Sequence, residues 1–286
     1  MLNLANHPCF GTTCGNPNTG RIHLPVAPTC NIFCRFCSRG QNPVLQRPGV
    51  TQKILSPTEA LGVMDLALRL CPDIKVAGVA GPGDPLASEE ALDTLSLIKQ
   101  YHPELMACLS TNGLELAAQM ERLLWVGVQT ITVTVNAVDP KILIHLNRGI
   151  IKDGKFCGGK LGAITLIEAQ ERGIRMAKQN SMLVKINFVL VPGLNEWHIA
   201  EVAQKTQEWG ADLLNIIPLI PASDLADYPA PTLPQLENAI QTAKKFLPVK
   251  RNCRHCRADA CGIPGGQDFS PEIYGNLPQA ETFSHG

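Results

Sequence analysis

Three cysteines close together near the start of the chain are the residues best suited to metal chemistry. Cys30, Cys34 and Cys37 follow an apolar stretch at residues 21–28. Thiolates are soft ligands that suit iron, and this short spacing lets one loop wrap one face of a cluster. Three thiolates bind three irons of a 4Fe–4S cluster, so the fourth iron stays open to a substrate or a cofactor.

The spacing of these cysteines argues against two simpler interpretations. C-x3-C-x2-C differs from the C-x2-C-x2-C run of bacterial ferredoxins. A structural zinc site normally has four ligands in paired C-x2-C units. We therefore favour an iron–sulfur cluster over structural zinc and over three reduced cysteines of the core.

The composition describes a compact protein of one large domain or two ordinary ones. The chain has 286 residues, of which 45% are hydrophobic and 17% charged. Its formal net charge is zero, so the overall electrostatics do not favour nucleic acid or an anionic membrane. Its apolar runs are too short to span a bilayer, and residues 1–8 lack the pattern of a secretory signal. We expect a cytoplasmic protein with neither a nucleic-acid nor a membrane partner.

The chain contains 11 cysteines, which have to be interpreted for a reducing compartment. Disulfides are rare in such a compartment, and clustered thiols more often bind metal or react. Cys71 ends a helical pattern and is interpreted as a packing residue. The roles of Cys14, Cys157 and Cys261 stay open.

Segments typical of buried strands alternate with helical patterns along most of the chain. Strands are expected at residues 21–28, 74–80, 104–110, 130–136, 182–190 and 213–220. Helices are expected at residues 56–70, 88–101, 114–124, 140–147, 161–172, 196–209 and 233–247, and a Gly- and Lys-rich insertion at 150–160. The first helix opens with a capping box, Ser56 to Glu59. The alternation predicts right-handed parallel crossovers, and so an α/β sheet or an incomplete barrel, since a closed barrel needs eight units.

Irregular segments flank this alternating region. Residues 1–20 are rich in Gly, Pro, Thr and Asn, and the periodicity stops again after Leu247. We therefore expect an N-terminal extension at 1–20, the α/β unit at 21–248, and a C-terminal extension at 249–286 whose last residues are loosely ordered.

Polar and glycine residues recur where the predicted strands end. Gly78–Pro85 follows the second strand, Ser110–Gly113 follows the third, and Asn136 and Asn187 stand near the ends of later strands. The carboxyl ends of parallel strands meet at one edge, so these groups are expected at one rim with the cysteine loop. Taken singly, the glycines also fit a tight turn and each asparagine a local cap.

A second cysteine pair, Cys253 and Cys256, lies in the C-terminal extension. An isolated C-x2-C also suits half a zinc site or a redox dithiol. Because three thiols are already assigned to one cluster, we favour a second iron–sulfur site built from distant segments. His23 and Cys9 are its available partners in the N-terminal part.

The three-cysteine loop resembles the signature of the radical S-adenosylmethionine (SAM) superfamily. The resemblance implies a six-unit partial TIM barrel in which SAM chelates the open iron. It also implies that an electron from the cluster cleaves SAM to a 5'-deoxyadenosyl radical. In this comparison Cys30, Cys34 and Cys37 hold the cluster. The expected SAM contacts are Gly81, Gly83 and Asp84, in the position of the motif that receives the amino group, together with Thr111, Asn112, Asn136 and Asn187.

Over about residues 5–265 the chain is also similar to the NifB family. The motifs that carry this similarity are Asn6–Phe10, Gly20–Pro28, the cysteine loop, Arg47–Val50, Ala80–Asp84, Cys108–Gly113, Val191–Asn195, Asn215–Pro221 and Cys253–Ala260. The resemblance implies an enzyme that builds the carbide-centred 8Fe–9S precursor of the nitrogenase cofactor. A SAM-derived methyl group is transferred to a cluster sulfide, hydrogen is abstracted, and two auxiliary 4Fe–4S units are fused.

The same resemblance implies the auxiliary ligands and the partners. His23, Cys253 and Cys256 match the ligands of one auxiliary cluster, and Cys9 and Cys108 match ligands of the other. The expected partners are an iron–sulfur cluster donor, a cofactor carrier or scaffold protein, and an electron donor.

The chain departs from the family pattern after the third cysteine. The family usually has an Asp-Cys pair and a Glu before Arg-Pro-Gly, but Ser38–Gln46 contains neither Cys nor Glu. A third ligand of the second auxiliary cluster is therefore unassigned, with Cys14 as a candidate. Two alternatives stay open: a radical SAM enzyme with one auxiliary cluster that acts on a small organic or peptide substrate, and a non-catalytic cluster carrier.

Overall fold

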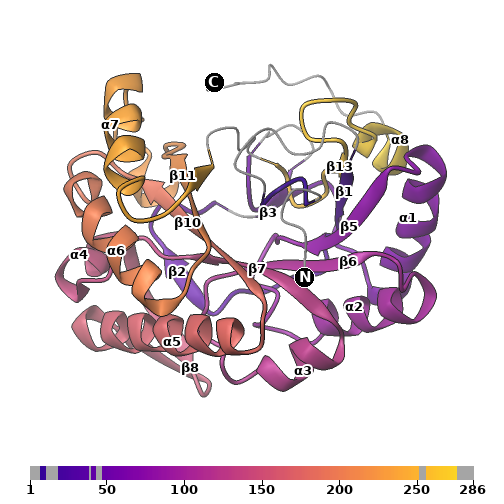
Figure 1. Ribbon diagram of the computed structural model, residues 1–286, viewed down its shortest axis with the longest axis horizontal. Coiled ribbons are helices and arrows are strands. Elements are labelled where there is room, and N and C mark those ends of the chain that lie inside the picture. The colour runs from indigo at the N-terminus through magenta and orange to yellow at the C-terminus, as the bar shows by residue number, and fades with distance from the viewer. Residues whose placement is uncertain (1–6, 11–18, 39, 43–46, 251–255, 276–286) are drawn as a thin grey trace.

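A curved sheet of eight strands forms the centre of the computed structural model (Figure 1). The structure describes residues 7–10, 19–38, 40–42, 47–250 and 256–275. The strand order is β12-β11-β10-β7-β6-β5-β1-β13. The strands are β1 (Gly20–His23), β5 (Ile74–Val79), β6 (Met106–Thr111), β7 (Val128–Thr134), β10 (Leu183–Leu190), β11 (Leu213–Pro218), β12 (Val249–Lys250) and β13 (Cys261–Gly262).

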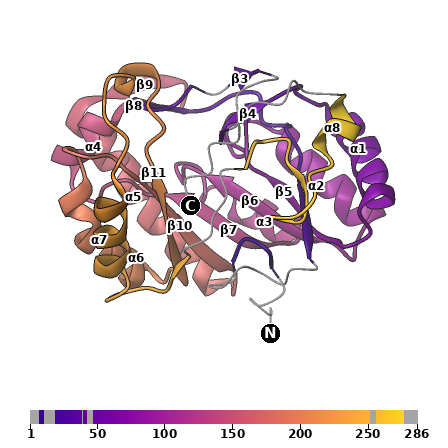
Figure 2. The same ribbon diagram turned by 90° about the horizontal axis from the view of Figure 1, so that it is seen from above.

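Neighbouring strands of this sheet run parallel, except that β13 pairs antiparallel with β1. Helices cover the outer side of the curve (Figures 1 and 2). They are α1 (Pro57–Leu70), α2 (Glu90–Tyr101), α3 (Met120–Trp125), α4 (Pro140–Leu146), α5 (Gly159–Gln179), α6 (Ile199–Trp209) and α7 (Leu233–Ala243). Over the described residues the order ends at β12 and β13 without closing, which confirms the predicted partial barrel.

Apolar side chains from the sheet and the helices form one large core. Ile22, Leu109, Ile131 and Phe188 come from four of the strands, and each is at most 1% exposed. β-Branched and aromatic residues suit strands that are covered on both faces, which is why these segments read as continuous apolar runs. No helix of the described chain is long and apolar enough to cross a membrane.

The six predicted strands correspond to β1, β5, β6, β7, β10 and β11, with shifts at their ends. The first strand ends at His23 instead of continuing to residue 28. Pro25 and Pro28 have no N–H to donate, so this stretch cannot continue a ladder. The predicted capping box is confirmed, because the Ser56 side chain accepts from the Glu59 N–H and Glu59 accepts from the Ser56 N–H.

Several helix boundaries differ from the predicted ones. The helix expected at 114–124 begins only at Met120, after a run of turns, while α5 extends from Gly159 to Gln179. A short 3-10 turn (Glu196–His198) precedes α6, and α7 ends at Ala243. These changes leave the order of the units intact.

The Gly- and Lys-rich insertion is a β-hairpin, which the sequence interpretation missed. It consists of β8 (Asn147–Lys152) and β9 (Lys155–Gly158), joined by Asp153 and Gly154, whose φ angles are 50° and 73°. Asp-Gly is a strong hairpin signal, because both positions of a type I′ turn need positive φ. β8 pairs antiparallel with β2 (Ile32–Cys34) in the cysteine loop. The hairpin therefore holds the cysteine loop from a segment more than 100 residues away in the chain.

The loop after β5 packs directly against the cysteine loop. The N–H of Gly83 donates to the carbonyl of Ala27 at 2.7 Å, and the N–H of Asp84 donates to that of Thr29 at 2.7 Å. A Cβ at Gly83 would lie 1.8 Å from the Thr29 carbonyl oxygen. Only glycine permits this approach of two backbone segments.

Part of the predicted polar tail is folded onto the barrel. β13 and α8 (Ser270–Tyr274) belong to it, and α8 packs against α1. A buried ion pair fixes this segment, with Arg257 Nε 2.8 Å from Asp259 Oδ1. Asp259 also accepts from the Thr51 hydroxyl and the Gln52 N–H, beside a short parallel pair, β3 (Gly40–Gln41) and β4 (Val50–Thr51).

Replacing Asp259 by Ala is expected to lower the free energy of unfolding by about 3–5 kcal/mol, because it leaves the buried Arg257 guanidinium without its carboxylate. Urea denaturation monitored by circular dichroism measures the loss. Glu208→Ala, which removes an exposed ion pair with Lys205, is the matched control and should leave the midpoint nearly unchanged. Equal midpoints for both variants would contradict the assigned role of the buried pair.

Gly83→Ala is expected to lower stability by at least about 1–3 kcal/mol, because the new methyl group overlaps a backbone carbonyl that cannot rotate away. Gly62→Ala is the control, since its Cβ would meet no atom within 4 Å in α1. That change should raise stability by about 0.5–1 kcal/mol. Thermal unfolding of both variants checks this prediction. A Gly83→Ala protein as stable as Gly62→Ala would refute the close approach of Gly83 to the Thr29 carbonyl.

Candidate functional site

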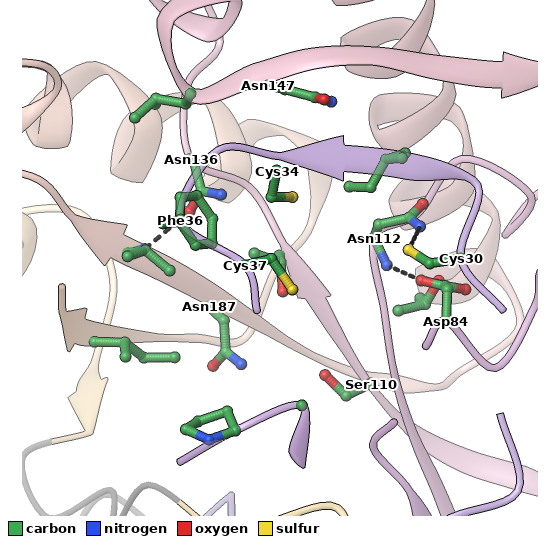
Figure 3. Close-up of a pocket in the computed structure, with 18 of the residues that line it drawn as sticks. Cys30, Cys34, Phe36, Cys37, Asp84, Ser110, Asn112, Asn136, Asn147 and Asn187 are labelled. Atoms are coloured by element: carbon green, nitrogen blue, oxygen red, sulfur yellow. Dashed lines mark hydrogen bonds between the residues drawn. The ribbon is translucent and has the colours of Figure 1, made fainter. Parts of the chain in front are cut away.

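A cavity of about 240 Å³ opens at the carboxyl ends of the parallel strands. We call it the first cavity. The three thiols of Cys30, Cys34 and Cys37 line it (Figure 3). The other predicted SAM contacts that line it are Gly83, Asp84, Thr111, Asn112, Asn136 and Asn187. Gly81 is absent from this lining, although its neighbours Ala80 and Pro82 belong to it.

The buried Asp84 carboxylate holds the turn that follows β6. It accepts from the Thr111 hydroxyl at 3.0 Å, from the Asn112 N–H at 2.5 Å and from the Leu86 N–H at 2.9 Å. Burial raises the pKa of Asp84, and the hydrogen bonds from Asn112, Leu86 and Thr111 oppose that rise. The carboxylate is thus engaged within the protein, and its direct effect is to orient Asn112.

Asn112 contacts both Asp84 and the first cysteine of the loop (Figure 3). Its side-chain amide donates to Asn31 Oδ1 at 2.7 Å and lies 3.9 Å from Cys30 Sγ. Its own Oδ1 accepts from the Leu114 N–H. An N–H group directed at a ligand sulfur stabilises the thiolate form and is one of the factors that set the potential of an iron–sulfur cluster.

Asn136 and Asn187 present amide groups at the same cavity. Asn136 Oδ1 accepts from the Val189 N–H at 2.9 Å, and Asn187 Oδ1 accepts from the Asn215 side chain at 2.9 Å. Because the oxygens are engaged, the NH₂ groups are the parts of these side chains available to a ligand. Donors of this kind suit a carboxylate or a hydroxyl group.

A second cavity, of about 140 Å³, adjoins the first. Ser110 and Asn187 line both cavities. Four donors predicted for auxiliary clusters line the second cavity: Cys9, His23, Cys108 and Cys256. Cys253 and Cys14 lie outside the described residues. Four segments far apart in the chain therefore bring metal-ligand side chains to one cavity.

His23 is oriented as a metal ligand would be. Its Nδ1 lies 3.2 Å from the Arg257 carbonyl oxygen, which can only accept, so Nδ1 carries the proton and Nε2 keeps its lone pair. Burial, with the nearby charge of Arg21, lowers the pKa of His23 to about 3. The imidazole is therefore neutral at pH 7, the form that binds metals.

The cysteines of the second cavity are held by different partners. Arg21 Nη2 donates to Cys256 Sγ at 2.9 Å. Burial raises the pKa of the Cys108 thiol to about 11, although a hydrogen bond with Thr130 opposes the rise. A bound metal would displace that proton, because thiolate is the ligating form. In chemical type and orientation these donors fit an iron–sulfur cluster.

Cys9 depends on His7, which the sequence interpretation did not single out. The Cys9 N–H donates to His7 Nδ1 at 3.0 Å, so the Nε2–H of His7 is the donor to the Thr130 hydroxyl at 3.3 Å. His7 is 1% exposed, and its ring packs edge-on against Phe10. His7 and Phe10 thus anchor the short segment that carries Cys9.

Two lysines that line the second cavity were also missed. Lys185 stands within the strand Leu183–Leu190, where most other residues are apolar, and Lys250 ends the sheet at β12. A charged residue inside an apolar strand is the signal that would have identified Lys185, because lysine is rarely buried without a partner.

The other three cysteines that the structure describes line neither cavity. Cys71 is 4% exposed and belongs to the core, as predicted, and Cys261 is fully buried. Cys157 lies in β9 and packs in a smaller apolar cluster.

Comparison with known proteins places these observations in a family. The model of the radical SAM superfamily matches residues 24–206. Over 98% of its length the chain is 41% identical to the FeMo cofactor biosynthesis protein NifB of Methanocaldococcus jannaschii, and it covers 95% of that protein. It is 38% identical to the protein of the same name from Chlorobaculum tepidum, of which it spans 66%, and 37% identical to that of Klebsiella pneumoniae, of which it spans 60%.

Solved structures support the fold. A radical SAM methyltransferase from Sphaerobacter thermophilus superimposes with a TM-score of 0.58 at 17% identity, over 82% of this chain and 67% of that one. Streptococcus suis SuiB bound to S-adenosylmethionine gives a TM-score of 0.56 at 14% identity, over 79% of this chain and 47% of that one. This chain thus shares its fold with solved structures of low sequence identity, and the relatives of higher identity show the family. The chain belongs to the NifB family within the radical SAM superfamily of enzymes.

Proposed function

We propose that this chain is a radical SAM enzyme of nitrogenase cofactor biosynthesis. In this proposal it fuses 4Fe–4S units and inserts a SAM-derived carbide, which makes the 8Fe–9S–C precursor of the cofactor. The observation that carries the proposal is the pair of adjoining cavities. One is lined by the three-cysteine loop, and the other by Cys9, His23, Cys108 and Cys256.

Membership of the superfamily implies a 4Fe–4S cluster and SAM as cofactors. Cys30, Cys34 and Cys37 would hold that cluster, and when bound it supplies the electron that cleaves SAM. The Asn112 amide supports this role, because it directs an N–H toward the Cys30 sulfur. β8 supports it too, since its pairing with β2 fixes the backbone of Cys34.

The polar residues of the first cavity divide into positioning and binding groups. Asp84 and Thr111 hydrogen-bond to each other, so in this proposal they act by orienting Asn112. The NH₂ groups of Asn136 and Asn187 are the donors for the carboxylate or the ribose of SAM. Gly83 contributes by its lack of a side chain, which lets the loop after β5 pack against the backbone of Thr29 next to the cysteine loop.

The second cavity is assigned to the substrate clusters. His23 and Cys256, with Cys253, would hold one 4Fe–4S unit, and Cys9 and Cys108 would contribute to holding the other. Methyl transfer and hydrogen abstraction both require a substrate sulfide close to SAM. Ser110 and Asn187 line both cavities, which supports that proximity. A cluster donor, a carrier protein and an electron donor are the partners that this function requires.

Measuring the iron and sulfide content per chain after anaerobic reconstitution tests the proposal. The native protein is expected to bind about eight to twelve irons, and a variant with Cys30, Cys34 and Cys37 all replaced by Ala is expected to lose only about four. Cys34→Ala should abolish formation of 5'-deoxyadenosine from SAM under strong reductant, because the cluster loses one of its three ligands.

Each alternative has its own outcome in these measurements. Native protein with about four irons, and none in the triple variant, would leave the second cavity without clusters and favour an organic or peptide substrate. SAM binding without any 5'-deoxyadenosine would favour a non-catalytic carrier. Cleavage that persists in Cys34→Ala would overturn the assignment of the cysteine loop.

A further inference from the structure

Two lysine side chains are buried at the second cavity. Lys185 lies on β10 and Lys250 on β12, and each is 6% exposed. β11 lies between these strands, with Lys185 in register with Leu213 and Lys250 with Asn215. Both side chains line the cavity that contains the auxiliary donors.

Both lysines contact backbone carbonyls of the segment that carries Cys9. Lys185 Nζ donates to the Cys9 carbonyl oxygen at 3.2 Å and lies 4.9 Å from the centre of the Phe10 ring. Lys250 Nζ donates to the Pro8 carbonyl oxygen at 3.3 Å. An ammonium group has three N–H donors, so the Cys9 carbonyl engages only part of the donor capacity of Lys185.

The charge balance of the second cavity is one-sided. None of the described residues that line it is Asp or Glu. The segments outside the described residues contain a single carboxylate side chain, Glu281. Elsewhere in the same structure a buried cation is paired in the ordinary way, as Arg257 is with Asp259.

Lys185 also acts on the donors of both expected clusters. Its positive charge lowers the pKa values of His7 and His23, after the larger effect of burial, and it favours the thiolate of Cys108 against burial. The Lys185 ammonium group thus acts electrostatically on both His23 and Cys108. A charge in that place favours any negatively charged occupant of the cavity.

We propose that Lys185 is the anion-binding element of the second cavity and neutralises the negative charge of its iron–sulfur cargo. The inference rests on the proposed function, because thiolates and sulfides make such a cluster anionic. Burying the Lys185 ammonium group in a cavity whose described lining has no carboxylate is costly, and an anionic occupant offsets that cost. Lys185 also donates to the Cys9 carbonyl, as Lys250 does to the Pro8 carbonyl. Charge neutralisation and placement of Cys9 therefore depend on the same side chain.

Lys185→Met tests the proposal, because it keeps the length of the side chain and removes the charge. Unfolding of the metal-free protein should begin at the same or a higher temperature than in the native chain, since an uncompensated buried charge is gone. The rise in that temperature on loading with iron and sulfide should shrink by at least about half. In the background with Cys30, Cys34 and Cys37 replaced by Ala, iron per chain should fall at least about twofold.

Two further variants separate charge from structure. Lys185→Arg keeps the charge and should retain most of the iron, while Lys205→Met on the exposed face of α6 should change nothing. A merely structural lysine predicts the opposite pattern: a lower unfolding temperature for metal-free Lys185→Met, with the effect of loading unchanged. That pattern, or equal iron loss in Lys185→Met and Lys185→Arg, would overturn the proposal.

Formation of 5'-deoxyadenosine by Lys185→Met distinguishes this inference from the proposed function. Retained SAM cleavage with lost second-cavity iron is the expected result. If the triple-cysteine background binds no iron even with Lys185 present, the anion-binding role is refuted, and SAM cleavage by the native chain then decides whether the radical SAM function stands.

Discussion

The turn at Gly83 and Asp84 is the constraint on which the rest of the site depends. Its two N–H groups hold the backbone of Ala27 and Thr29, just before the cysteine loop. Its carboxylate holds the turn after β6, and that turn directs an amide at Cys30. Gly83 and the buried Asp84 therefore join the segments that follow three neighbouring strands. A carboxylate is suited to this task because it accepts several hydrogen bonds at once.

The two cavities differ in the charged groups that line them. Among the described residues that line the first, Asp84 is the only carboxylate, and donors of the protein itself occupy it. Neutral amides and Arg47 line the same cavity. In the second, burial keeps His23 neutral and opposes ionisation of Cys108, while two lysines bring positive charge. Neutral donors with nearby cations form a cavity suited to an anionic metal cluster, whereas a carboxylate there would repel it.

Placement of the cysteine loop and of Cys9 relies on long-range contacts more than on local structure. β8 pairs with the cysteine loop although the two segments lie more than 100 positions apart in the sequence. His7 hydrogen-bonds to Thr130, which lies 123 positions further along the chain. The Arg257–Asp259 pair fixes the segment whose carbonyl orients His23. The described parts of the two extensions are thus held by contacts with strands of the sheet.

The sequence by itself determined the cluster loop, the alternation of strands and helices, and the set of candidate donors. These are local properties: ligand spacing within eight residues, apolar periodicity within one element, and capping residues at its ends. The hairpin was missed although its Asp153-Gly154 signal is local, because the segment was interpreted as an insertion.

Only the tertiary structure decided which distant donors share a cavity, which ring nitrogen of His23 is free, and that Lys185 and Lys250 lie beside Cys9. These relations depend on strand register and on packing between segments up to 242 positions apart. No periodicity within a single element encodes such a contact, because it exists only when the sheet has brought its strands together.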